Sequence, residues 1–233
     1  MIDFGNFFGS DGRALVLGSS GAIGAAVLEV LTNEIGSDRV IGLSRKSHGF
    51  DFLNESSIEE LACQQSGFFR LIFDATGALE INGNTPEKTL KSIDAENMQL
   101  HFLINAIGPA LIIKNFMKFL PKTGKSVFAT LSARVGSIED NRLGGWVSYR
   151  ASKAALNQII RTASVELSFK IPGSICVALH PGTVDSKLTE KYSSRYKVIS
   201  PENSARKLLS VINSLTDADN GSFIDQNGDR IKW

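Results

Sequence analysis

Short runs of apolar, β-prone residues alternate along the chain with longer stretches in which apolar positions recur at helical spacing. Runs that are apolar at consecutive positions suit strands of a parallel sheet covered on both faces, and right-handed crossovers then place helices on the two faces. The pattern predicts an α/β fold, a doubly wound parallel β-sheet with helices on both faces. The predicted strands are Ala14–Leu17, Val40–Leu43, Phe69–Phe73, Ser126–Leu131 and Ile175–Leu179.

No repeat, low-complexity tract or linker divides the sequence, so residues 1–233 are expected to form a single domain. Residues 184–200, rich in Ser, Lys and Tyr, are the best candidate for a mobile loop. Ser200-Pro201 then predicts a helix start, with Ser at the N-cap and Pro in the first helical position. The residues from Gly221 onward predict a final strand and a turn at Asn227-Gly228.

Charge and composition narrow the range of partners. The 25 Lys and Arg residues against 24 Asp and Glu give a formal net charge of +1, so we expect no nucleic acid and no membrane surface as a partner. The two cysteines, Cys63 and Cys176, lie far apart and the three histidines are scattered, which predicts a reduced, cytoplasmic protein without a metal site. The first residues lack the positive charge of a signal peptide, and no uninterrupted apolar run is long enough to span a bilayer.

A glycine-rich segment, Gly18-Ser19-Ser20-Gly21-Ala22-Ile23-Gly24, lies between the first predicted strand and a helical stretch. Its glycines let the backbone turn sharply and approach a pyrophosphate, and free N–H groups at a helix start favour negative charge. The alternative is a strand-to-helix turn that binds nothing. Because the segment opens a strand–helix unit near the start of the sequence, we favour a dinucleotide site in a Rossmann fold.

The second predicted strand ends in Leu43-Ser44-Arg45-Lys46, with no acid to accept hydrogen bonds from a ribose 2′-hydroxyl. The guanidinium of Arg45 could instead pair with a 2′-phosphate, which favours NADP(H) over NAD(H). In the alternative interpretation, Arg45 and Lys46 are two solvated surface cations that bind no phosphate.

Tyr149 and Lys153 stand four residues apart at the start of a predicted helix, and this spacing puts them on one face. A phenol with a pKa of about 10 is a poor proton donor at neutral pH, and a nearby ammonium lowers that pKa by favouring the phenolate. The pair is therefore a candidate general acid with its tuning group. Taken alone, a Tyr and a Lys at this spacing are a weak signal.

In order and spacing, a set of motifs resembles the short-chain dehydrogenase/reductase family over almost the whole chain. These motifs are the glycine segment, Asn105-Ala-Ile-Gly108, Leu131-Ser132-Ala-Arg-Val-Gly136, Tyr149-x-x-x-Lys153 and Pro181-Gly182-Thr-Val-Asp-Ser186. The glycine spacing G-x-x-G-x-x-G departs from the family's commoner G-x-x-x-G-x-G. Within the family, Gly136-Ser-Ile-x-Asp-Asn141, Gly144-Gly145-Trp146 and the terminal Gly-x-Phe-x-Asp…Trp233 resemble the C-factor-like, cell–cell signalling subgroup.

The resemblance implies a role for each of four residues. Tyr149 would donate a proton to the developing alkoxide, and Lys153 would hold the nicotinamide ribose and tune Tyr149. Ser132 would hydrogen-bond the substrate carbonyl, and Asn105 would bind a water that links Lys153 to solvent. Ser137 and Asn97 are rival candidates for the last two roles, and structural roles for Ser132 and Asn105 are the alternative.

The resemblance also implies contacts with the cofactor. The run Asp74-Ala75-Thr76-Gly77 replaces the family's Asn-Asn-Ala-Gly beside the ribose, and Asp51 would lie near the adenine, unless it caps a helix or is solvated. The turn after the fifth strand would receive the carboxamide, with His180 in a structural role. The residues of this turn are Pro181, Gly182, Thr183, Val184 and Ser186.

The predicted function is reversible, NADP(H)-dependent reduction of an aldehyde or ketone to an alcohol. The alternative is a dinucleotide-binding signalling or regulatory protein on the same fold, since fold alone does not separate the two. Leu188, Tyr192 and Tyr196, together with residues 138–146, would wall the pocket and favour an apolar or aromatic substrate. A homodimer or homotetramer, formed through the helices near residues 97–120 and 146–168, is expected from the resemblance.

Overall fold

The structure is a computed structural model that describes every residue except 1, 3, 6, 50, 52–53 and 187–197. The predicted mobile loop at 184–200 is thus described only at its two ends. Leu188, Tyr192 and Tyr196, predicted to wall the pocket, lie outside the described residues.

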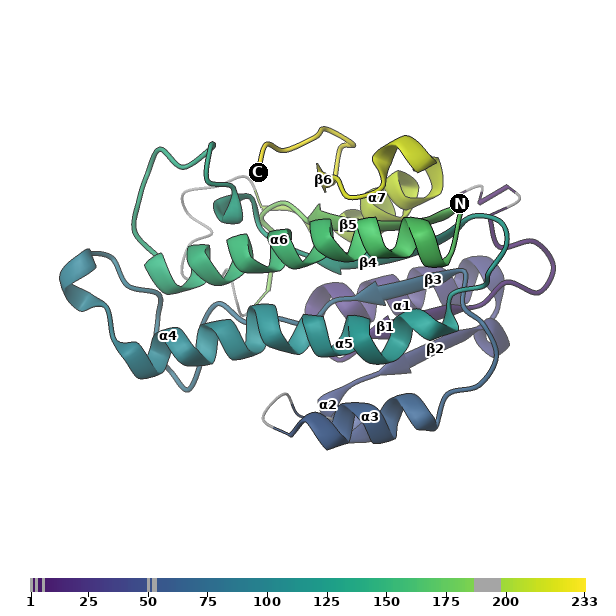
Figure 1. Cartoon of the computed structure of the whole chain (residues 1–233), viewed down its shortest axis with the longest axis horizontal. Helices are drawn as coiled ribbons and strands as arrows, with labels where there is room; N and C mark the ends of the chain where they lie inside the picture. The colour runs from purple at the N-terminus through teal and green to yellow at the C-terminus, as the bar shows by residue number, and fades with distance from the viewer. Residues whose placement is uncertain (1, 3, 6, 50, 52–53, 187–197) are drawn as a thin grey trace.

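A six-stranded, wholly parallel sheet forms the middle of the molecule, which confirms the predicted fold class (Figure 1). The strands are β1 (Ala14–Leu17), β2 (Val40–Leu43), β3 (Leu71–Asp74), β4 (Ser126–Leu131), β5 (Ser174–His180) and β6 (Phe223–Asp225). Their order is β2-β1-β3-β4-β5-β6. The chain therefore switches direction across the sheet between β1 and β3, the position where doubly wound folds bind ligands.

Helices cover both faces of this sheet, as Figure 1 shows. On one face lie α1 (Ala22–Ile35) and α7 (Pro201–Ser214), which pack against each other. On the other lie α3 (Glu55–Cys63), α5 (Gly108–Phe116) and α6 (Val147–Lys170). Two further α-helices in the described part of the chain are α2 (Arg45–His48) and α4 (Ala95–Phe102), with a π-helical turn η3 (Leu103–Ile107) between α4 and α5.

Two hydrophobic clusters hold these layers together. Val16 and Phe73 pack into the α1–α7 cluster, while Leu15 and Phe128 pack into the cluster beneath α3, α5 and α6. Because successive side chains of a strand point to opposite faces, a strand buried on both faces needs apolar residues at consecutive positions. This is the physical reason that the strands could be recognised as uninterrupted apolar runs.

Several element boundaries follow local sequence signals. Ser200 caps α7 by accepting a hydrogen bond from the Asn203 N–H at 3.2 Å, and Pro201 is the first helical residue, as predicted. The third strand starts at Leu71 rather than Phe69, because the Phe69 N–H donates to the Phe119 carbonyl at 2.8 Å instead of joining the sheet. The short helix α2 was not predicted from the sequence.

The helical run from Ala95 to Phe119 is long and apolar enough to cross a membrane by length and composition alone. Polar residues such as Asn97 and Asn105 interrupt the run, so it is not the uninterrupted apolar run that the sequence was expected to lack. Buried core helices meet the same criteria, and this run carries Ile112 and Phe116 into the cluster beneath the sheet. The helix is thus accounted for by core packing, and it is weak evidence for a membrane span.

Candidate active site

The carboxyl ends of the four central strands meet at one edge of the sheet, since all strands are parallel. Leu17 of β1 pairs with Asp74 of β3, Asp74 with Thr130 of β4, and Leu131 of β4 with Leu179 of β5. The segments that follow these strands are the predicted phosphate loop, residues 75–77, Ser132 and the Pro181 turn. The fold therefore brings most of the predicted site residues to one edge.

The glycine segment forms a tight turn that leads into α1. A Cβ atom on Gly24 would lie 2.2 Å from the Gly18 carbonyl oxygen, and Gly18 itself has a φ of +77°, so both positions require glycine. At the N-cap of α1, Gly21 supplies no side-chain hydrogen bond, and no acid lies in the first turn. Ser20 and Gly21 are exposed to solvent. The start of α1 can therefore take an anion, and a pyrophosphate fits this cradle.

Asp74, at the end of β3, is fully buried and organises the next segment. One carboxylate oxygen accepts from the Thr76 N–H at 2.9 Å and the Thr76 hydroxyl at 2.6 Å, and the other accepts from the Thr130 hydroxyl at 2.8 Å. Burial raises the pKa of Asp74, and these hydrogen bonds oppose that rise. The side chain thus fixes the path of residues 75–77, the segment predicted to lie beside a ribose of the cofactor.

Lys153 reaches this edge of the sheet from α6. Its side-chain Nζ donates to the Leu131 carbonyl at 2.9 Å, and the residue is only 3% exposed. Burial lowers the pKa of Lys153 to about 8, and the charge of Asp74 opposes this shift. A Cβ atom on Gly77 would lie 3.1 Å from Nζ and 3.0 Å from Oδ1 of Asn105, so only glycine leaves the space beside both groups open.

Asn105 lies in the π-helical turn η3 and is fully buried. Its Oδ1 accepts from the Ala78 N–H at 2.8 Å, and its Nδ2 donates to the Ala78 carbonyl at 2.9 Å. Nδ2 also lies 3.3 Å from Nδ1 of His101. Single π-helical turns often occur at functional sites, and this one turns Asn105 toward the Gly77 segment.

Tyr149 lies in the first turn of α6, and Lys153 follows one turn later on the same helix, as predicted. Tyr149 is buried, and burial raises the pKa of its hydroxyl far above the ordinary value. The rings of His101 and Trp146 lie edge-on to it, with centroids at 6.0 and 6.3 Å. The role of Tyr149 as a proton donor stays a prediction, in which the ammonium of Lys153 would lower this pKa.

Ser132 is where the contacts differ most from the predicted role. Its hydroxyl donates to Oδ1 of Asn157 at 2.6 Å, and the residue is buried. Asn157 follows Tyr149 by eight residues on α6, or about 12 Å along the helix axis. The hydroxyl therefore braces β4 against α6. The catalytic role of Ser132 stays a prediction.

Three residues predicted to contact the adenosine half of the cofactor follow β2 in the sequence. Ser44 is the N-cap of α2, where its hydroxyl accepts from the Ser47 N–H at 3.2 Å, and Arg45 starts that helix with an exposed side chain. Asp51 lies in the turn before α3, and its N–H donates to the Ser57 hydroxyl at 2.8 Å. Ser44 thus has a capping role that the sequence did not predict, and Arg45 is placed at the strand end as expected.

Contacts from α7, Gln226 and Ile199 hold the turn that follows β5. The Pro181 carbonyl accepts from the Ser204 hydroxyl of α7 at 2.8 Å, and Gly182, with a φ of +79°, lies against the Gln226 side chain. Beyond it, the Thr183 carbonyl accepts from the Ile199 N–H at 3.0 Å. Val184 forms a bridge with Ile199, and the Ser186 hydroxyl donates to the Val184 carbonyl at 3.4 Å.

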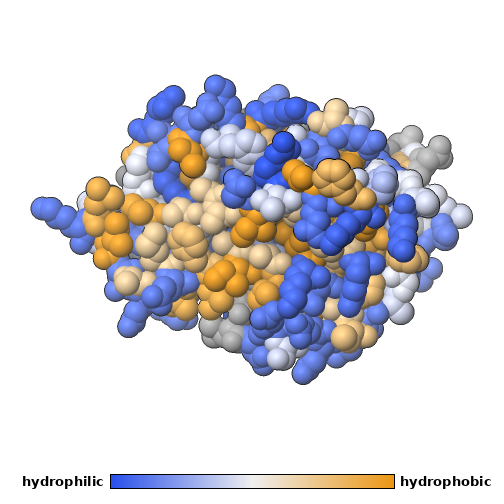
Figure 2. Space-filling view, viewed as in Figure 1, coloured by the Kyte–Doolittle hydropathy of each residue, from blue (hydrophilic) through white to orange (hydrophobic). Residues whose placement is uncertain are grey.

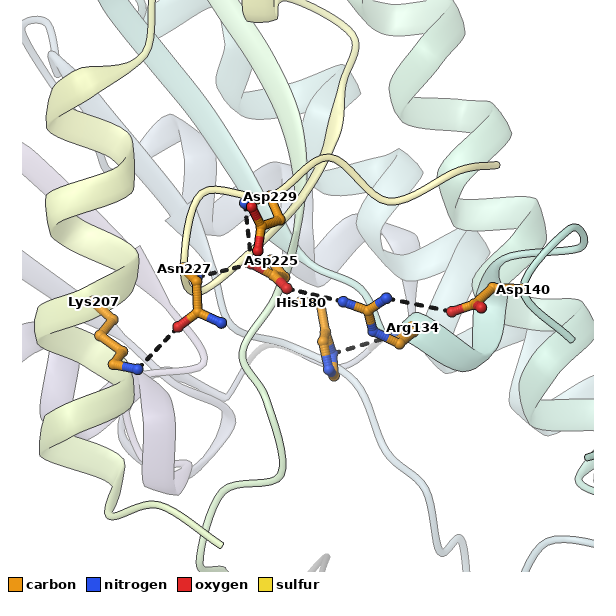
Figure 3. Close-up of polar contacts among 7 residues, drawn as sticks. All are labelled: Arg134, Asp140, His180, Lys207, Asp225, Asn227 and Asp229. Atoms are coloured by element: carbon orange, nitrogen blue, oxygen red, sulfur yellow. Dashed lines mark hydrogen bonds and ion pairs between the residues drawn. The ribbon is translucent and has the colours of Figure 1, made fainter. Parts of the chain in front are cut away.

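An ionic network fixes the neighbouring loop, as Figure 3 shows. Arg134, directly after β4, pairs with Asp225 of β6 at 2.9 Å and with Asp140 at 3.3 Å. Nδ1 of His180 accepts from the Arg134 backbone N–H at 3.3 Å. Burial, together with the charge of Arg134, lowers the pKa of His180 to about 4. A neutral histidine that accepts a hydrogen bond is consistent with the structural role expected for it.

Two residues near Tyr149, His101 and Glu87, were not singled out from the sequence, whereas Trp146 belongs to the segment expected to wall the pocket. His101 and Trp146 contact the Tyr149 ring, and the buried Glu87 binds the start of α6. Glu87 stands in the polar stretch Asn84-Thr-Pro-Glu-Lys88, which has the composition of a solvated loop. The repeated spacing of Asn97, His101 and Asn105, four residues apart on one helical face, is the signal that could have indicated a buried polar row.

Comparison with known proteins agrees with this geometry. Residues 13–197 match the family model described as short chain dehydrogenase. The chain belongs to the short-chain dehydrogenase family. It is therefore an oxidoreductase of a family that binds nicotinamide dinucleotides, and the resemblance inferred from the motifs is confirmed.

Two curated relatives are similar over much of the chain. A 1-hydroxy-2-glutathionyl-2-methyl-3-butene dehydrogenase from Rhodococcus sp. (strain AD45) is 30% identical over 188 residues, which cover 79% of each protein. C-signal from Myxococcus xanthus is 32% identical over 144 residues, covering 62% of this chain and 83% of that protein. The second relative supports the C-factor-like resemblance.

Solved structures of low sequence identity share the fold. The carbonyl reductase Sniffer of D. melanogaster superposes with a TM-score of 0.79 at 19% identity, covering 95% of this chain and 99% of that chain. The NADPH-bound carbonyl reductase from chicken fatty liver gives 0.78 at 22% identity, covering 95% and 98%.

We predict that the buried ammonium of Lys153 makes stability depend on pH. Between pH 8 and the ordinary lysine pKa, the unfolded chain holds a proton that the folded chain has lost. The free energy of unfolding should therefore rise with pH in this window, by up to about 1.4 kcal/mol per pH unit. Urea denaturation at several pH values measures this free energy of unfolding. The rise should vanish in Lys153→Met and persist in Lys170→Met, whose side chain is exposed; equal pH slopes in all three proteins would contradict the assignment.

Proposed function

We propose that this protein reversibly reduces an aldehyde or ketone to an alcohol with NADP(H). The observation that carries the proposal is the placement of Lys153 and Asn105 around Gly77, with Tyr149 one turn before Lys153 on α6. A missing Cβ leaves space there beside a buried amine and a buried amide. A protein that only binds a dinucleotide needs the phosphate cradle, but it has no use for a tyrosine beside a buried ammonium.

In this proposal Tyr149 gives its proton to the alkoxide that develops on the substrate carbonyl. Lys153 lowers the cost of the resulting phenolate and holds the ribose hydroxyls of the cofactor. Asn105 orients a water that resupplies the proton. These groups meet charge that appears only during the reaction, and stabilising that charge raises the rate. The nicotinamide, when bound, supplies the hydride.

The chain's own residues would hold the dinucleotide at successive points along the sheet edge. The pyrophosphate would lie on the start of α1, formed by Gly18, Ser19, Ser20, Gly21, Ile23 and Gly24. Ser44 and Arg45 would hold the adenosine 2′-phosphate, with Asp51 near the adenine. The ribose would lie against Ala75, Thr76 and Gly77, and the carboxamide against Pro181, Gly182, Thr183, Val184 and Ser186.

For the substrate, we propose an apolar or aromatic carbonyl compound, supported by the exposed Ile138 and Leu143 in the loop before α6. A role as a dinucleotide-binding signalling protein is the second candidate, favoured by the similarity to C-signal. A cytoplasmic location stays part of the proposal, supported by the free thiols of Cys63 and Cys176.

We also propose that two copies associate through the face formed by α5 and α6. Figure 2 shows an apolar band across these helices. Val165 and Phe169, one turn apart on α6, are exposed, Phe169 to 82%. Exposed apolar surface of this kind on a globular protein is typical of a subunit interface, and a second copy would present the same face.

The reaction is tested with NADPH and a panel of aromatic and aliphatic carbonyl compounds. Wild-type protein should oxidise NADPH with at least one of them. Tyr149→Phe removes the proton donor, so kcat should fall by about 10² to 10⁴, while the affinity for NADPH stays the same in a fluorescence titration. Turnover by Tyr149→Phe close to the wild-type rate would exclude Tyr149 as the acid. Absence of turnover with the whole panel would favour the signalling alternative.

The preference for NADP(H) is tested at Arg45. Removing a charged hydrogen-bond donor from a phosphate weakens binding by about tenfold or more, so Arg45→Ala should raise the Kd for NADPH by that factor and leave the Kd for NADH unchanged. Lys46→Ala, which removes the exposed neighbouring cation, is the matched control. An equal loss of NADPH and NADH affinity in Arg45→Ala would refute a specific phosphate contact.

The proposed interface is tested by light scattering after size exclusion. Wild-type protein should elute with the mass of a dimer or tetramer. Phe169→Glu places a charge in the apolar face and should shift the protein toward a smaller assembly, whereas Phe68→Glu, at an exposed phenylalanine before β3, should not. A wild-type mass equal to one chain would refute the interface.

A further inference from the structure

The start of the helix that carries Tyr149 is built from unusual backbone. Gly144, Gly145 and Trp146 all have positive φ values, of 63°, 65° and 54°. A bulky residue such as tryptophan rarely adopts this left-handed conformation, so other contacts must hold it there. Trp146 is the N-cap of α6 but makes no capping hydrogen bond with its side chain, and the first turn of the helix contains no acidic residue.

Glu87, which is 61 residues before Ser148 in the sequence, supplies what this helix start lacks. Its backbone carbonyl accepts from the Trp146 N–H at 2.6 Å. One carboxylate oxygen accepts from the Ser148 N–H at 3.2 Å, and the other accepts from the Ser148 hydroxyl. A carboxylate that accepts from a first-turn N–H is a helix cap, and here the cap comes from a distant segment.

The carboxylate of Glu87 is buried, with 6% of the residue exposed, yet it carries its charge at neutral pH. Burial by itself would raise the pKa of Glu87, but the hydrogen bonds from Ser148 outweigh burial and leave the pKa below its ordinary value. A negative charge at this end of α6 is stabilised by the helix dipole.

Glu87 is linked to three residues that lie next to Tyr149. Ser148 directly precedes Tyr149, and the Trp146 ring lies edge-on to the tyrosine ring. The ring of His101 also lies edge-on to Tyr149, and the charge of Glu87 acts on His101. Nδ1 of His101 in turn lies 3.3 Å from Nδ2 of Asn105. Glu87 therefore holds Trp146 through its backbone carbonyl, holds Ser148 through its carboxylate, and acts on His101 through its charge.

We infer that Glu87 is a positioning residue for the reaction, which caps the catalytic helix from outside and fixes the placement of Tyr149 through Trp146 and Ser148. The inference rests on the proposed role of Tyr149 as the proton donor. A misplacement of a reacting group by about 1 Å can cost a hundredfold in rate, so a cap at this turn acts on kcat more than on substrate affinity.

Glu87 also acts on the electrostatics beside the phenol, through His101. Burial lowers the pKa of His101, and the negative charge of Glu87 opposes that shift. Removing the charge should therefore lower the pKa of His101 further.

The experiment compares Glu87→Ala, Glu87→Gln and Glu60→Ala, where Glu60 is an exposed glutamate of α3 that serves as the matched control. Glu87→Ala should lower kcat by about ten- to hundredfold, with KM and the Kd for NADPH nearly unchanged. Glu87→Gln keeps an acceptor for Ser148 and should retain more of kcat than Glu87→Ala. Adding Ser148→Ala to Glu87→Ala should cause little further loss, because both changes remove the same contact.

Hydrogen exchange at the Ser148 and Tyr149 amides provides a readout that needs no substrate. Exchange at these amides should be faster in Glu87→Ala than in the wild type and unchanged in Glu60→Ala. If wild-type protein turns over no carbonyl compound, the proposed function fails, and the exchange rates still decide whether Glu87 caps the helix. Wild-type kcat in both Glu87 variants, or unchanged exchange in Glu87→Ala, would overturn the inference.

Discussion

The burial of one ammonium group constrains the whole active-site region. Lys153 is almost inaccessible to water, and an isolated charge in such a place is strongly unfavourable. The carbonyl of Leu131 and the negative charge of Asp74 offset part of that cost. Close approach needs glycine on two sides, since a Cβ on Gly136 would lie 2.8 Å from Cβ of Lys153 and one on Gly77 would lie 3.1 Å from its Nζ.

The need of the Lys153 amine for hydrogen-bond and charge partners also fixes where the polar groups of the candidate site lie. The strands are apolar on both faces, so the polar groups of the site lie at the strand ends and on the helix that packs against them. Asp74 and Leu131 end neighbouring strands, and α6 delivers Lys153 between them. Tyr149 then lies one turn nearer the start of α6, where its surroundings depend on how that start is held.

The loops around the site are fixed by long-range contacts. Glu87 holds the start of α6, and Arg134 ties the loop after β4 to Asp225 near the end of the chain. His180 accepts a hydrogen bond from the same loop. Each contact joins segments far apart in the sequence, so the site is a property of the complete sheet and its covering helices rather than of one strand–helix unit.

Local signals in the sequence determined the strands, the cap of α7, the glycine turn before α1 and the placement of Tyr149 and Lys153 on one helix. These depend on the spacing of neighbouring residues, which a sequence displays directly. Only the tertiary structure decided that Ser132 donates to Asn157 and that Glu87 caps α6, because hydrogen-bond partners 25 and 61 residues apart are chosen by how the elements pack. A serine after a strand and a glutamate in a polar loop look the same in sequence whether they are buried or solvated.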